Sequence, residues 1–240
     1  MTEDAAADAD PGAAAGPAAE GGHPLLRLLL DAADGRFPPV DGAVTVLPEL
    51  GRGIECSVAF TGHAVVATAL PEAEVQARGP NGFGGSLAPD FLRWLAGPQG
   101  VIGEIDVVLV ARGTGGIPDG TPKLTVRHDV EQHPRVRYAR TVRTRVQVYG
   151  DQRGFVTLAE GLAGRRELSI ELERPDAGGS GAGGSGLGRA LLADALALVP
   201  SGEPVFAAVS PGNARSLRAF LAAGFVPVGS ETLLRPARDG

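Results

Sequence analysis

Alternating hydrophobic and polar residues predict a series of short strands separated by turns. Two alternating runs flank the dipeptide Thr61-Gly62 and predict a β-hairpin. Three later runs are joined by short loops, which require an antiparallel meander. The predicted strands cover residues 55–60, 63–70, 105–113, 146–149, 155–160, 167–172, 204–210 and 225–234.

Apolar residues at helical spacing predict helices between these strands. In the helix that follows the glycine-rich stretch 178–188, the leucines share one broad face, with Arg189 and Asp194 opposite. A strand, a helix and a strand in succession near the C-terminus form a right-handed parallel crossover, so the sheet is mixed. The predicted helices cover residues 24–33, 89–96, 134–143, 187–199 and 213–223.

Composition adds the class of protein to this picture. With 240 residues and 43% hydrophobic content, the chain can bury a sizeable core. It carries neither an apolar run of about 18 to 20 residues, which a membrane span needs, nor a secretory signal. We therefore expect a cytoplasmic protein that does not bind membranes. Residues 1–22, rich in alanine and acids without a basic residue, are expected to be disordered.

Charge and cysteine content exclude several kinds of site. The net charge of −6 argues against a nucleic-acid surface. The basic residues in 135–145 lie at helical spacing and indicate a solvated helix face. Cys56 is the single cysteine, so we expect a buried small side chain, with no disulfide and no metal site.

The glycine-rich stretch has three possible explanations. A flexible linker suits residues 178–182. A dinucleotide-binding loop fits Gly181-x-Gly183-x-x-Gly186, but no acidic residue ends the next strand to bind a ribose. The third explanation is an anion site, in which backbone amides at the start of a helix hold a pyrophosphate.

Two segments decide among these explanations. Together, "SGLGRALL" (185–192) and "NARSLRAFLAAGF" (213–225), separated by one strand, resemble the GNAT superfamily of N-acetyltransferases. The resemblance covers about residues 104–240. It implies an α/β (α+β) fold with a mixed, mostly antiparallel sheet flanked by helices, to which an N-terminal α/β segment is added. It also implies that two strands splay apart around the pantetheine arm of acetyl-CoA.

The resemblance also implies a set of acetyl-CoA contacts and marks two departures. Asn213 by itself is typical of a helix cap, and by resemblance it would contact the coenzyme. Gly183 stands where the family has Gln or Arg. Phe220 stands where many members have the tyrosine that protonates the departing thiolate. The implied acetyl-CoA-binding residues are Leu172, Ser185, Gly186, Leu187, Gly188, Arg189, Ala190 and Asn213.

A base is required because a lysine-like amine is neutral in only about one molecule in 10³ to 10⁴ at pH 7. In "ELSIELE" (167–173) the acidic residues project from one strand face. We expect Glu171 to be the catalytic base, with Glu167 as the second choice. The alternative interpretation is a solvent-facing acidic strand edge.

The sequence thus predicts an acetyl-CoA-dependent N-acetyltransferase acting on a small-molecule or protein amine. A non-catalytic acyl-CoA-binding or assembly module is the main alternative, and a nicotinamide-dependent oxidoreductase is a third. Residues 101–240 form the predicted coenzyme-binding domain. Residues 23–100 either form a small domain or extend the sheet over the acceptor side, where His63 and the loop 79–85 would shape the pocket. The sequence leaves the oligomeric state open, and a homodimer is one possibility.

Overall fold

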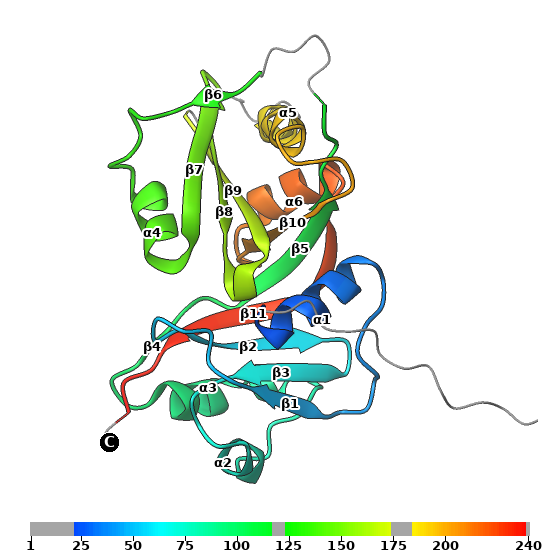
Figure 1. Cartoon of the computed structure of the whole chain (residues 1–240), viewed down its shortest axis with the longest axis vertical. Coiled ribbons are helices and arrows are strands. Elements are labelled where there is room, and N and C mark those ends of the chain that lie inside the picture. Colours follow the sequence, from blue (N-terminus) through cyan, green and yellow to red (C-terminus); the bar gives the residue numbers. More distant parts are fainter. Residues whose placement is uncertain (1–21, 117–122, 174–183, 239–240) are drawn as a thin grey trace, which may run out of the picture.

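The described part of the chain forms one mixed sheet with helices on both faces (Figure 1). The computed structural model describes residues 22–116, 123–173 and 184–238; at 184 and 185 it describes the backbone alone. The strands are β1 Val44–Leu47, β2 Glu55–Phe60, β3 His63–Ala67, β4 Val101–Ile102, β5 Asp106–Arg112, β6 Thr125–Val126, β7 Thr144–Asp151, β8 Gly154–Glu160, β9 Arg166–Leu172, β10 Pro204–Val209 and β11 Val226–Arg235. The helices are α1 Pro24–Ala33, α2 Glu72–Ala77, α3 Pro89–Ala96, α4 Pro134–Val142, α5 Gly184–Leu196 and α6 Ala214–Ala222, with short 3-10 turns η1 Gly85–Leu87 and η3 Leu162–Gly164.

The predicted fold class is confirmed. The β2–β3 hairpin turns at Thr61-Gly62 as predicted, β7, β8 and β9 form the antiparallel meander, and β9 and β10 are parallel. Four elements were not predicted: β1, β4, β6 and α2. Each has only two to six residues, which is too short for a periodic pattern to develop. The disorder expected for residues 1–21 and the flexibility expected for 178–182 lie outside the described residues.

The N-terminal strands extend the C-terminal sheet. The strand order is β1-β3-β2-β11-β5-β10-β9-β8-β7-β6, with β4 also paired to β11. The junction is the antiparallel pair β2–β11, which runs from Ser230 opposite Ala59 to Leu234 opposite Glu55. Of the two arrangements open to residues 23–100, the structure therefore has the sheet extension.

The alternating side chains of the central strands supply both faces of the sheet. On β5, Val108 and Val110 pack with α1, whereas Leu109 and Ala111 pack with α5 and α6. This follows from the period of two in a strand. Because both faces are covered, the central strands are apolar on nearly every residue, and the few charged residues among them need a local explanation.

Candidate functional site

The two parallel strands β9 and β10 part soon after they meet. Their register consists of one pair, Phe206 opposite Glu167, and beyond it the strands diverge. Ile170 of β9 and Ala208 of β10 line a common cavity on the far side of that pair. We call this opening the β9–β10 wedge. A sheet that separates in this way leaves backbone groups available to an extended ligand.

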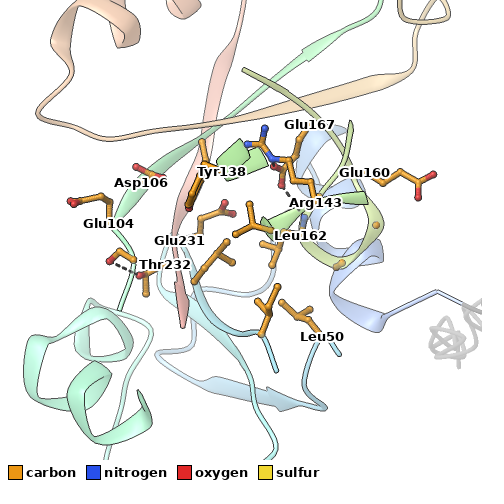
Figure 2. A pocket seen from close by; sticks show the side chains of 18 of the residues that line it. Leu50, Glu104, Asp106, Tyr138, Arg143, Glu160, Leu162, Glu167, Glu231 and Thr232 are labelled. Atoms are coloured by element: carbon orange, nitrogen blue, oxygen red, sulfur yellow. Dashed lines mark hydrogen bonds and ion pairs between the residues drawn. The ribbon is translucent and has the colours of Figure 1, made fainter. Parts of the chain in front are cut away.

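The wedge opens into a cavity of about 700 Å³. At one end are residues of β9, β10 and α6, and at the other are residues of α1, α4, β11 and the segments before β2 and β5. Figure 2 shows Tyr138 of α4 with Asp106 on one side and Arg143 and Glu167 on the other. The residues that line the cavity include Arg52, Glu104, Asp106, Tyr138, Arg143, Glu160, Glu167, Ile170, Ala208, Ser210, Asn213, Phe220 and Glu231.

Among the predicted coenzyme contacts, Asn213 lines this cavity. Its Oδ1 accepts a hydrogen bond from Ser216 N at 3.1 Å, so it also caps α6 as its sequence position suggests. Phe220 lines the cavity from the next turns of α6 and stacks edge-on against Phe225. The cap bond uses Oδ1, so the two hydrogens of the Asn213 side-chain amide nitrogen are donors that the cap does not use.

The predicted loop residues lie at the start of α5, away from the cavity lining. Gly186, Leu187, Arg189 and Ala190 are exposed. Gly188 is buried, and a Cβ on it would lie 3.4 Å from the Ala219 Cβ and 4.0 Å from Leu172 Cδ1. Gly188 therefore permits close packing of α5 on α6, and Leu172 packs in the core between them. Ser185 belongs to α5, and its side chain lies outside the described residues.

The two predicted bases occupy different surroundings. Glu171 does not line the cavity, and its Oε2 accepts a hydrogen bond from Arg135 Nε at 2.6 Å. Glu167 lines the cavity and is buried. Burial raises the pKa of Glu167, but the charges of Arg143 and Arg165 outweigh it and hold that pKa well below its usual range.

A close backbone approach holds the Glu167 carboxylate in place. Leu162 N donates to Glu167 Oε1 at 2.9 Å. A Cβ on Gly161 would lie 2.1 Å from the Glu167 Cδ, so no other residue fits at 161 without displacing the carboxylate. The turn between β8 and β9 thus fixes one carboxylate beside the cavity.

A buried ion network joins this turn to β11. The Arg165 side chain is fully buried, and its Nη1 and Nη2 each donate to the Glu231 carboxylate at 2.7 Å. Its Nε donates to Glu167 Oε1 at 2.9 Å, and its guanidinium lies 5.1 Å from the Phe206 ring centroid. A charge this deep is tolerated because three of its N–H groups donate to carboxylates and the Phe206 ring lies beside it.

Arg143 corrects one prediction from the sequence. The basic stretch 135–145 was interpreted as a solvated helix face, yet the Arg143 side chain is only 11% exposed and lines the cavity. Its Nε lies 2.6 Å from Glu167 Oε2 but is not aligned for a hydrogen bond. The interpretation failed here because Arg143 follows the last residue of α4, where helical spacing no longer places a side chain.

Asp106 was not among the predicted site residues. It lies directly opposite Glu231 in the β5–β11 register, so the two carboxylates share one face of the sheet. Burial, and then the charges of Glu231 and Glu104, raises the pKa of Asp106 to about 6. The signal in the sequence is an acidic residue at the start of an apolar strand. Burying an unpaired carboxylate costs free energy, so such a residue is expected to have a partner or a function.

His63 and the loop 79–85 do not line the cavity, contrary to their expected position. His63 lies in β3, where its Nδ1 is 2.9 Å from Asp41 Oδ1 and its Nε2 is 3.0 Å from Thr45 Oγ1. The acceptor end is closed instead by α1 and by Leu50, Arg52 and Ile54. The expectation failed because the turn of the β2–β3 hairpin lies at the opposite end of β2 from Ile54, which lines the cavity.

Comparison with solved structures shows a likeness to an acetyltransferase structure. No family model matches the chain, and no curated protein matches it. A crystal structure from Novosphingobium aromaticivorans, described as an acetyltransferase from the GNAT family, is 17% identical and covers 58% of this chain and 69% of that chain, with a TM-score of 0.35. Conclusions about function rest on the residues of this chain.

The described residues contain neither a membrane-spanning helix nor a group of metal-ligating side chains. None of the described helices has both the length and the apolar character to cross a membrane. In the same residues, no three His, Cys, Asp or Glu side chains are grouped so as to hold a metal ion.

Proposed function

We propose that this protein is an acetyl-CoA-dependent N-acetyltransferase that acts on an amine. The observation that carries the proposal is the β9–β10 wedge, which leads into a cavity with carboxylates at its far end. An extended thioester arm in the wedge would bring its acetyl group toward the acceptor side. The crossover helix α5 begins at Gly184, within the predicted glycine-rich stretch.

The residues present fit such a ligand. The wedge is flanked by Ile170 and Ala208, and polar groups of Ser210 and Asn213 lie beside it in the cavity lining. Amides at the start of α5, in the stretch from Ser185 to Ala190, supply a partial positive charge suited to a pyrophosphate. When bound, acetyl-CoA supplies the acetyl group as a thioester, and the chain holds both reactants.

Calorimetry with the full chain tests this proposal. We expect acetyl-CoA to bind, and the variant Ala208→Phe to bind at least ten-fold more weakly because the new ring fills the wedge. The matched control is Ala222→Phe, which places the same ring on an exposed position of α6 and should leave the affinity unchanged. Absence of acetyl-CoA binding to the wild-type protein would refute the proposal.

A second candidate is a non-catalytic acyl-CoA-binding module, and Phe220 is the observation that favours it. Phe220 lines the cavity at 3% exposure and has no proton to give to a departing thiolate. In a catalytic protein that proton would come from the acceptor amine itself. Release of CoA thiol with any amine from a panel of alkyl amines would exclude this candidate.

A further inference from the structure

The charges that line the acceptor end of the cavity are mostly paired. Arg143 and Arg165 carry two positive charges against Glu167 and Glu231. Outside this network, Arg145 Nη1 lies 2.7 Å from Glu160 Oε1. These pairs leave little net charge for a ligand to meet.

Two carboxylates are left over. Within the described residues, the side chains of Glu104 and Asp106 both line the cavity and form neither an ion pair nor a hydrogen bond. The lining holds two more cations: Arg135, whose Nε donates to Glu171 Oε2 at 2.6 Å, and Arg52, an exposed residue whose Nη2 donates to Thr141 O at 3.3 Å. The acceptor end therefore carries an excess of negative charge on the strand start that holds Asp106.

The position of Asp106 differs from that of the other acids in the cavity. Asp106 lies opposite Glu231 of β11 and near Glu104, which precedes β5. The other charged or titratable groups around it are Tyr138 of α4, Arg143 directly after α4, and Glu167 of β9. The Arg165 guanidinium neutralises the charge of Glu231 through their ion pair. Asp106 is thus a partly buried carboxylate that lines the cavity next to a neutralised partner, and in Figure 2 it lies on the side of Tyr138 away from Arg143 and Glu167.

We propose that Asp106 is the general base of the acetyl transfer and that the acceptor is a cationic amine without a neighbouring carboxylate, received by Asp106 and Glu104. This inference rests on the proposed function. A raised pKa of about 6 suits the role, because a carboxylate with that pKa is ionised at pH 7 and is a stronger base than ordinary Asp.

The proton balance of the reaction is simple. The substrate ammonium gives one proton to the Asp106 carboxylate, which passes it to solvent. The amine lone pair then attacks the thioester carbonyl carbon, a C–N bond forms, and the C–S bond breaks. The second proton lost by the nitrogen goes to the leaving thiolate, which yields the amide and CoA thiol. Phe220 is not required in this sequence.

The pH profile of kcat/KM separates this role from a structural one. Because the amine has a pKa near 10, the wild-type profile should rise through pH 6 and form a plateau until the amine titrates. In Asp106→Asn the reaction depends on free amine, so kcat/KM should keep rising with unit slope through pH 9. The loss should be about 10²- to 10⁴-fold at pH 7 and should shrink toward pH 10.

The test uses the full chain, with acetyl-CoA and a thiol-release assay. Propane-1,3-diamine and β-alanine are the acceptor probes, because they have the same carbon chain length and differ in the second group. We expect kcat/KM for the diamine to be at least ten-fold higher. Glu104→Gln should reduce that preference mainly through KM, Asp106→Glu should restore part of the plateau, and Glu72→Gln, on an exposed helix, should match the wild type.

Calorimetry makes the possible failures distinguishable. Asp106→Asn should bind acetyl-CoA as the wild type does, because Asp106 lies at the acceptor end. An unchanged pH profile in Asp106→Asn, or equal use of β-alanine, overturns the inference and leaves the proposed function standing. Absence of acetyl-CoA binding to the wild type overturns both. Binding without thiol release from either probe supports the non-catalytic module and removes the role of Asp106.

Discussion

Removing the buried guanidinium of Arg165 is the sharpest test of how the site is built. In Arg165→Met the apolar length of the side chain is kept, but two hydrogen bonds to Glu231 and one to Glu167 are lost. Glu167 keeps its ion pair with Arg143, whose Nε lies 2.6 Å from Glu167 Oε2. Glu231, which is only 4% exposed, loses its ion-pair partner.

The expected cost follows from leaving one carboxylate buried and unpaired. Breaking such a pair on one side costs about 3 to 5 kcal/mol at pH 7. Removing both partners avoids the orphaned charge, so Arg165→Met combined with Glu231→Leu should regain most of that loss. Arg165→Lys keeps the charge but not the two parallel hydrogen bonds, and it should fall between the wild type and Arg165→Met.

The pH dependence of the loss has a definite sign. In the wild type the lowered pKa of Glu167 contributes stability above its unfolded value of about 4.3, and that contribution is lost as the pH falls toward the folded pKa. In Arg165→Met the Glu231 carboxylate stays buried without its ion-pair partner, so the cost of burying its charge applies at neutral pH and disappears in acid, where the carboxyl group is neutral. The deficit of the variant should therefore be larger at pH 7 than at pH 4.5.

Urea unfolding measured by circular dichroism and by the fluorescence of the single tryptophan, Trp94, provides the assay. Arg36→Met is the matched control, because Arg36 is 64% exposed and pairs with Asp31 at the surface, and it should leave the unfolding midpoint unchanged. A deficit below about 1 kcal/mol, or one that does not change between pH 7 and 4.5, would show that Arg165 does not compensate Glu231 as described.

Three further changes test the surroundings of the site. Asn213→Ala should lower the free energy of unfolding by about 1 kcal/mol, since the hydrogen bond to Ser216 N is lost, and thermal unfolding by circular dichroism measures it. Gly188→Leu should destabilise by about 1 to 3 kcal/mol because of overpacking against Ala219, whereas Gly188→Ala should be neutral or stabilising, because the added Cβ lies at an ordinary 3.4 Å from the Ala219 Cβ and alanine has the higher helix propensity; equal losses in urea unfolding would contradict this. Burial raises the pKa of the Cys56 thiol, so a maleimide should label it at pH 8 only after unfolding; labelling of the native protein at the rate of a free thiol would show that it is accessible.

Local chemistry determined most of the secondary structure. The hairpin at Thr61-Gly62 and the helix from Asn213 to Gly224 were predictable because turn residues, caps and periodicity act over a few neighbours. The expectation that Asn213 caps a helix is confirmed for the same reason. Strand β6 was missed because two residues cannot express a period.

Position in the sheet was decided by tertiary structure. The sequence indicated acids on one face of β9, but it could not indicate that Arg135 holds Glu171 and that Arg143 and Arg165 hold Glu167. Those arginines come from other elements, and the pairing depends on how β9 lies beside α4 and η3. The acetyl-CoA contacts and both predicted bases therefore stay predictions, although the wedge beside them is described.

By itself, the sequence determined the fold class, the order of the main elements and the presence of a helix after a glycine-rich loop, because these depend on contacts within short segments. Only the tertiary structure placed Asp106 opposite Glu231 and joined both to one cavity. The two residues are more than a hundred positions apart, and their register is set by the packing of β5 on β11. A carboxylate's pKa depends on such neighbours, so this part of the site could not be derived from the sequence.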